Sequence, residues 1–175
     1  SRGEVIPVPP GVRRLPNNKG LEALVVVPKG KDTGLPLAGT LIAFSERGLD
    51  ADGNLVAFLI GGPSPGTFSV RRTKNFDISD ATLLPSGDLL LLERKFSMLE
   101  GVGIRIRRVP LASVVPGAVI DGPTIFEVDL GYEIDNMEGI DAHVGSEGET
   151  VLTLVSDDNF SLLQRTLLLQ FTLVA

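Results

Sequence analysis

The sequence predicts an all-β protein built from short antiparallel strands. Of the 175 residues, 43% are hydrophobic, 20 are Gly and 12 are Pro. The hydrophobic residues occur as many short runs separated by turns that contain Gly or Pro, which is typical of turn-rich β proteins. This hydrophobic content is enough to bury a core, and the length is that of one domain.

Three segments of the chain share the same order of features, which indicates an internal repeat. Each segment opens with an acidic residue among small and apolar ones, and these acids are evenly spaced: Glu22, Asp80 and Glu138. Each then passes through a turn into an apolar run that ends in a second acid: Glu46, Glu93 and Asp157. Beyond these acids, residues 94–99 align with residues 158–163.

Each segment also predicts a series of strands. The Gly-containing turns at 85–88 and 146–149 lie between apolar runs and are typical of hairpins. Residues 104–107, Ile-Arg-Ile-Arg, alternate with a period of two, which predicts a strand with one buried and one solvated face. Residues 110–115 predict a single helical turn. The third strands are expected at 55–60, 103–109 and 165–173, and the fourth strands at 68–73 and 124–130.

A four-stranded antiparallel unit that recurs about every 40–60 residues predicts the blades of a β-propeller. We place three blades within the single domain, near residues 17–76, 77–134 and 135–175. Propellers close with about four to eight blades, so three blades form only part of a ring. We therefore expect either an N-terminal half of the propeller outside this sequence or a second copy of the chain. Residues 5–8 are short and Pro-containing, and so a poor closing strand.

Charge and composition exclude several classes of function. The net charge of −6 gives no counterion release on DNA or RNA, so nucleic acid is not an expected partner. The absence of Cys excludes disulfides and thiolate metal sites. No apolar run approaches the roughly 20 residues of a membrane-spanning helix, and the first residues do not form a signal peptide.

Two pairs of motifs carry a resemblance to a known family. The first is Asn-Asn-Lys-Gly-Leu-Glu-Ala-Leu at 17–24 with Leu-Ile-Ala-Phe-Ser-Glu at 41–46, and the second is Asn-Met-Glu-Gly-Ile at 136–140 with Val-Ser-Asp-Asp-Asn-Phe-Ser at 155–161. In this order, they resemble the C-terminal half of phytase-like (esterase-like) β-propeller proteins. The resemblance implies a six-bladed ring, a periplasmic or secreted bacterial protein, and phosphoesterase or esterase activity. Related alkaline phytases bind calcium in the propeller channel, which makes Ca²⁺ a candidate cofactor.

Under this resemblance, the recurrent acids are candidate calcium ligands and the neighbouring Arg residues are candidate binders of the ester. Carboxylate oxygens suit Ca²⁺, and guanidinium groups suit phosphate. The candidate ligands are Glu22, Glu46, Glu138 and Asp157, and the candidate catalytic residues are Arg47 and Arg94. The residues themselves favour a structural interpretation, in which the acids accept backbone hydrogen bonds or form salt bridges between blades. Asp80 lacks the family motif and is a weaker candidate.

Three further features have ordinary interpretations. Residues 50–54 carry oxygen ligands at alternate positions but lack the Gly and Glu that complete a calcium loop, which predicts a β-turn. His143 is the only histidine, and no Gly-x-Ser-x-Gly motif occurs, so it is expected to be a packed or surface residue. The Gly-rich segment 61–66 has no Lys and no following helix, which predicts a loop rather than a phosphate-binding site.

The family resemblance, together with the recurrent acids, therefore implies metal-assisted hydrolysis of a small phosphate ester. The alternative is a non-catalytic propeller that binds a ligand or a protein, because propellers host many unrelated functions.

Overall fold

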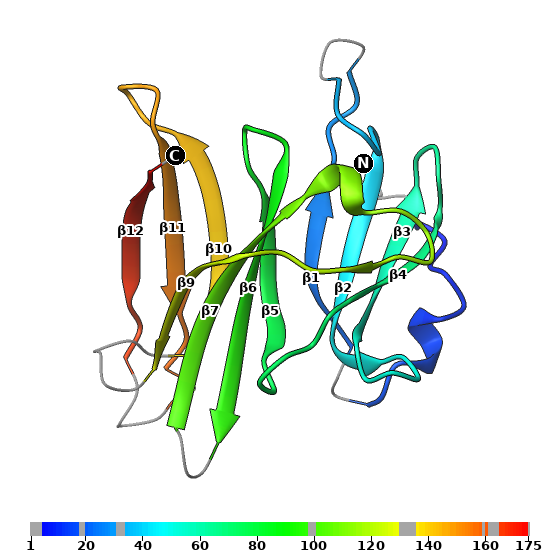
Figure 1. The fold of residues 1–175 in the computed structure, drawn as a ribbon, viewed down its shortest axis with the longest axis horizontal. Coiled ribbons are helices and arrows are strands. Elements are labelled where there is room, and N and C mark those ends of the chain that lie inside the picture. Colours follow the sequence, from blue (N-terminus) through cyan, green and yellow to red (C-terminus); the bar gives the residue numbers. More distant parts are fainter. Residues whose placement is uncertain are drawn as a thin grey trace.

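The chain forms an all-β structure (Figure 1). The computed structural model describes residues 5–17, 20–30, 34–97, 101–129, 136–158, 160 and 165–174. Within these ranges, the regular elements are strands and two single-turn 3₁₀ helices, η1 (Val12–Arg14) and η2 (Leu111–Ser113). The predicted helical turn near residue 110 is η2. None of the described helices is long and apolar enough to cross a membrane.

The strands form three separate sheets that are mainly antiparallel, and none of them is closed. The first sheet has the order β1-β2-β3-β4-β8 and contains β1 (Leu21–Val26), β2 (Thr40–Leu49), β3 (Leu55–Gly61), β4 (Gly66–Val70) and β8 (Val119–Ile120). The second has the order β5-β6-β7-β9 and contains β5 (Asp77–Leu83), β6 (Asp88–Ser97), β7 (Gly101–Pro110) and β9 (Thr124–Asp129). The third contains β10 (Met137–Val144), β11 (Thr150–Ser156) and β12 (Leu168–Leu173).

The predicted hairpin turns are confirmed. Gly87 between β5 and β6 has φ +91°, and Gly148 between β10 and β11 has φ +86°. Glycine adopts this left-handed conformation at no steric cost. The Gly87 N–H donates to the carbonyl of Leu84 at 2.9 Å, which closes the first of these turns.

The short strand β8 returns the chain from the second sheet to the first. It pairs in parallel with β4, and the N–H groups of Ser69 and Arg71 donate to the carbonyls of Ala118 and Ile120 at 2.8 and 2.9 Å. This strand is not predictable from the sequence, because two residues carry no periodic signal. The strand ties the first two sheets together through backbone hydrogen bonds.

The second sheet lies between the other two and buries both faces. In Figure 1, β5 lies between β1 and β10, and contacts join β5 to both strands. Leu89 and Leu91 belong to the core shared with the first sheet, whereas Leu90 and Leu92 belong to the core shared with the third. Successive residues of a strand point to opposite faces, so the uninterrupted Leu run of β6 supplies both cores.

Each sheet has a β-bulge on its first strand. Aligning the three sheets at these bulges shows which residues occupy equivalent positions in the repeat. The pairing shifts between Leu21 and Ala23, between Ile78 and Asp80, and between Met137 and Gly139. The residues in the bulges are therefore Glu22, Ser79 and Glu138. The predicted correspondence of Asp80 with the two Glu residues is wrong, since Asp80 lies one position later, where the other sheets have Ala23 and Gly139.

The strand pairing also shows that the predicted equivalence of Glu46, Glu93 and Asp157 is wrong. The residue just before each bulge pairs with a residue of the second strand. This partner is Ser45 in the first sheet, Glu93 in the second and Ser156 in the third. Glu93 is therefore equivalent to Ser45 and Ser156 of the other sheets. One position later in the chain, the equivalent residues are Glu46, Arg94 and Asp157. Even spacing along the sequence could not detect this shift, because pairing across the strands determines it.

We predict that Leu90→Ala and Leu91→Ala will destabilise the protein by similar amounts, because each opens a cavity in a different core. Both side chains are fully buried, and such truncations cost about 2–5 kcal/mol. Chemical denaturation followed by circular dichroism measures the effect. Leu24→Ala is the control, since Leu24 is 59% exposed. A loss confined to one of the two core variants would contradict burial of both faces.

Candidate functional site

The three sheets meet around the guanidinium group of Arg94, near the C-terminal end of β6. Its Nη1 donates to Oδ1 of Asn136 at 2.6 Å and to Oε1 of Glu138 on β10. Its Nη2 lies 4.0 Å from Oε1 of Glu46 on β2. The structure thus brings together three of the predicted site residues, Glu46, Arg94 and Glu138, each from a different sheet.

The bulge explains how Glu138 reaches this position. A bulged residue lacks a direct partner on the neighbouring strand, and its side chain can be redirected. Oε1 of Glu138 also accepts a hydrogen bond from Nδ2 of Asn136 at 2.5 Å, and Asn136 is only 7% exposed. Asn136 therefore holds both the Arg94 cation and the Glu138 carboxylate. In the sequence, Asn136 is part of the motif at 136–140, but nothing there predicts its role.

Arg47 forms a second charged contact between the first and second sheets. Its Nε donates to Oδ2 of Asp77 at 2.7 Å, and Nε of Arg72 donates to Oδ1 of the same carboxylate at 2.8 Å. The hydrogen bond with Asp77 raises the pKa of Arg47, against the opposing effect of burial. Arg47 therefore contacts a buried carboxylate rather than the Arg94 cluster.

The remaining predicted calcium ligands, Glu22 and Asp157, lie at the same end of the first and third sheets. Glu22 is exposed in the bulge of β1. Asp157 follows β11, and its N–H donates to the carbonyl of Asn136 at 3.1 Å. Its backbone is therefore adjacent to the residue that holds Arg94, while its side chain is exposed.

The described residues do not fit a calcium ion as they stand. Calcium takes six to eight oxygen ligands. Across the described part of the chain, no three His, Cys, Asp or Glu residues are grouped to hold a metal. Within the Arg94 cluster, the guanidinium contacts both Glu46 and Glu138, so a cation is already paired with these carboxylates.

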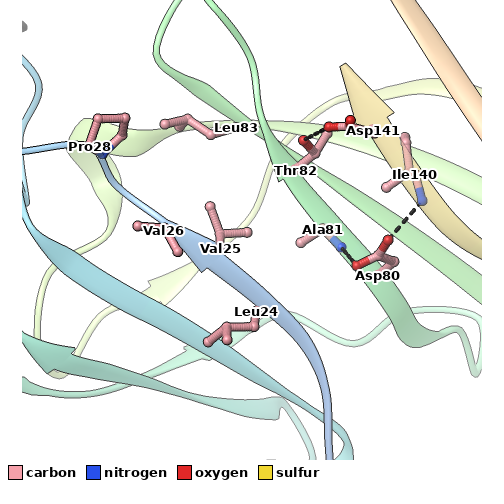
Figure 2. A pocket seen from close by; sticks show the side chains of 10 residues that line it. All are labelled: Leu24, Val25, Val26, Pro28, Asp80, Ala81, Thr82, Leu83, Ile140 and Asp141. Carbon is pink, nitrogen blue, oxygen red and sulfur yellow. Dashed lines mark hydrogen bonds between the residues drawn. The ribbon is translucent and has the colours of Figure 1, made fainter. Parts of the chain in front are cut away.

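The first strands of the three sheets line a pocket of about 410 Å³ (Figure 2). Its lining includes Leu24 and Val26 of β1, Asp80 and Thr82 of β5, and Asp141 of β10. Oγ1 of Thr82 donates to Oδ1 of Asp141 at 3.3 Å, which joins the second and third sheets. The pocket therefore combines an apolar wall with two carboxylates.

Asp80 also joins the second and third sheets at this pocket. Its Oδ2 accepts the N–H of Ile140 on β10 at 2.8 Å, and its Oδ1 accepts the N–H of Ala81 at 2.8 Å. Burial raises the pKa of Asp80; the two hydrogen bonds oppose this rise and the nearby charge of Asp141 adds to it. Asp80 thus has the predicted structural role, since its carboxylate accepts one backbone N–H of the neighbouring third sheet, from Ile140.

The second sheet contains a buried ion-pair network that the sequence did not predict. Oε2 of Glu93 accepts hydrogen bonds from Nε of both Arg105 and Arg107 at 2.8 Å, and Oε1 accepts Nη2 of Arg107 at 2.5 Å. The side chains of these three residues are 0%, 3% and 2% exposed. The prediction that this face of β7 is solvated is therefore wrong, because Glu93 on β6 neutralises the two Arg side chains.

Other groups contact the same network. Nη1 of Arg107 donates to Oδ1 of Asp121 at 2.8 Å, and Nη1 of Arg105 donates to Oγ1 of Thr73 at 2.8 Å. The Arg105 guanidinium lies 4.3 Å from the ring centroid of Phe76, a cation–π contact. The network therefore anchors the loops that precede β5 and β9.

The remaining candidates are a turn, an exposed histidine and a loop. Residues 50–54 form the predicted turn between β2 and β3, in which Oδ1 of Asp50 accepts the N–H groups of Asp52 and Asn54. His143 is exposed on β10, opposite Val151. The Gly-rich segment 61–66 connects β3 and β4, as predicted.

The comparisons with known proteins identify the family. The family model described as "Phytase-like: Esterase-like activity of phytase" matches residues 1–160. The chain belongs to this phytase-like family, which confirms the resemblance carried by its motifs. Searches of curated proteins and of solved structures found no match.

We predict that Glu93→Ala will destabilise the protein by about 3–5 kcal/mol, because it leaves two buried cations without their carboxylate. Denaturation followed by circular dichroism measures the change. Glu127→Ala is the control, since Glu127 pairs with Lys74 in an exposed ion pair, which contributes about 0–1 kcal/mol. Equal effects of the two variants would contradict the buried network.

We also predict a pH-dependent effect of Asp80. Its pKa is raised in the folded state, so its contribution to stability is present below its ordinary pKa of 3.8 and is lost as the pH rises through the folded value. The stability of Asp80→Asn relative to wild type should therefore increase with pH above 3.8. In Asp141→Asn, a carboxyl NMR titration should show a lower pKa for Asp80. A difference between wild type and Asp80→Asn that does not change with pH would contradict this assignment.

Proposed function

We propose that the protein is a phytase-like β-propeller that hydrolyses phosphate esters, and that its three sheets are neighbouring blades. The family match carries this proposal. The arrangement of the sheets supports it, since their first strands lie side by side and the middle sheet is buried on both faces. In a propeller, the first strands face a central channel, and the pocket between β1, β5 and β10 is then one wall of that channel.

In this proposal, Arg94 binds the phosphate group of the ester. Its side chain is 28% exposed, and a guanidinium group presents N–H donors that match phosphate oxygens. Asn136 and Glu138 act as positioning residues, because their hydrogen bonds to Nη1 fix the orientation of the guanidinium. Because both of these contacts are made by Nη1, the proposed donor to the substrate is Nη2, which forms an ion pair with Oε1 of Glu46 at 4.0 Å.

Calcium stays a prediction of the family resemblance. The proposed step therefore uses only the binding of the ester by Arg94, and hydrolysis should be measured with and without added calcium. Further blades, from another part of the propeller or from a second copy, would supply any ligands that these three sheets lack. Action in the periplasm or outside the cell belongs to the same proposal.

We predict that Arg94→Ala will lower kcat/KM for p-nitrophenyl phosphate by roughly 10²–10³-fold, the usual effect of removing one donor that stabilises a developing negative charge. Arg71→Ala is the control, since Arg71 is an exposed Arg that pairs with Asp121 at 3.4 Å outside the cluster. Release of p-nitrophenol measures the reaction. The proposal fails if the wild-type protein does not hydrolyse this ester with or without calcium, or if both variants retain full activity.

One observation favours a second candidate, a non-catalytic propeller that binds a ligand or a protein. Both predicted catalytic Arg residues contact carboxylates of a neighbouring sheet, as residues that only join blades would. In that case, Arg94→Ala should lower Tm, and no hydrolysis of phosphate or carboxylate esters should be detected in wild type. Turnover that depends on Arg94 would exclude this candidate.

A further inference from the structure

The hairpin of β6 and β7 extends beyond β5 and carries a Phe side chain next to Arg94. The pairing of β6 with β5 ends where Arg94 lies opposite Asp77, whereas its pairing with β7 continues without a shift to Ser97. The part of β6 beyond Arg94 therefore has β7 as its only described neighbour in the sheet, and it projects downward in Figure 1. This projecting part contains Phe96.

Arg94 and Phe96 lie on the same face of this hairpin. Successive side chains of a strand point to opposite faces. Lys95 points to the other face, where its Nζ lies 5.5 Å from the ring centroid of Phe76, whereas Arg94 contacts Glu138 of the third sheet. Phe96 therefore follows Arg94 along one face, at a spacing of roughly 7 Å along the strand for two residues.

Packing of the three sheets leaves the ring of Phe96 open to solvent. The first and third sheets both contact the second, yet Phe96 is 79% exposed. Its partner across the hairpin is Val102, a second apolar residue. Single exposed apolar residues are ordinary at protein surfaces. Phe96 differs because it lies beside a guanidinium group whose side chain is itself 28% exposed, so one small molecule can contact both groups.

We propose that Phe96 determines the substrate class of the Arg94 site, which is a phosphate ester of an aryl or alkyl alcohol. The phosphate group accepts a hydrogen bond from Nη2 of Arg94, and the apolar group of the alcohol packs on the exposed ring of Phe96. A polyhydroxylated alcohol gains nothing from this contact, because its hydroxyl groups would lose water against the ring. The inference rests on the proposed function, since it assigns a substrate class to the same site.

Calorimetric titration with phenylphosphonate and methylphosphonate tests the contact without turnover. Wild type should bind phenylphosphonate about tenfold more tightly than methylphosphonate, the upper range for one aromatic pair. Phe96→Ser should abolish this preference, and Phe96→Trp should retain it. Arg94→Ala should weaken binding of both phosphonates. Val144→Ser is the control and should behave as wild type does, since Val144 is 56% exposed at the opposite end of β10 from Glu138.

Hydrolysis of two esters separates this inference from the proposed function. Release of inorganic phosphate measures the reaction for 1-naphthyl phosphate, which is apolar, and for glycerol 2-phosphate, which is polar. Phe96→Ser should lower kcat/KM for the naphthyl ester about tenfold and leave that for the glycerol ester within about twofold of wild type. Because each ester is compared with itself, the different reactivities of the two leaving groups cancel.

Equal affinity of wild type for the two phosphonates, or equal effects of Phe96→Ser on the two esters, would overturn the inference. Hydrolysis that depends on Arg94 but not on Phe96 would leave the proposed function intact and remove only the substrate class. If wild type hydrolyses neither ester but prefers phenylphosphonate through Phe96, the proposed function fails, and the binding of an apolar phosphate compound at Arg94 and Phe96 stands.

Discussion

The burial of both faces of the second sheet is the constraint on which the rest of the structure depends. Leu89 and Leu91 pack toward the first sheet, and Leu90 and Leu92 pack toward the third. Because the side chains of a strand alternate, a shift of the pairing by one residue would exchange the two sets of contacts. The register of β6 therefore fixes the position of both neighbouring sheets, and with it the place where Arg94 meets Glu46 and Glu138.

Polar contacts also join the second sheet to its two neighbours, and they constrain the packing differently from the apolar cores. Asp80 binds a backbone N–H of the third sheet, and Asp77 binds Arg47 of the first. Apolar burial favours contact of two sheets without defining their angle or offset, whereas these hydrogen bonds require particular atoms to meet. Their directionality selects one arrangement of the sheets. The candidate site consists of contacts of this kind, so its geometry and the packing of the sheets are determined together.

Local features of the fold could be predicted from the sequence, whereas contacts between distant residues could not. The apolar runs of β2, β6 and β11 and the Gly turns at 87 and 148 depend on neighbouring residues, and these predictions were confirmed. The exposure predicted for Arg105 was wrong because its partner Glu93 lies on another strand. The correspondence of Asp80 was wrong because a bulge is defined only by pairing across strands. Glu46, Arg94 and Glu138 were identified as separate candidates, but their meeting depends on how three sheets pack.

The strand β8 links the order of synthesis to the order of folding. It completes the edge of the first sheet with residues that lie after β5, β6 and β7 in the chain. A ribosome must therefore release most of the second sheet before the first is complete. Once β8 is paired, the two sheets share a backbone connection, and unfolding of one exposes an edge of the other. We expect them to behave as one cooperative unit in native-state hydrogen exchange, whereas the third sheet, to which no described strand returns from another sheet, can open separately.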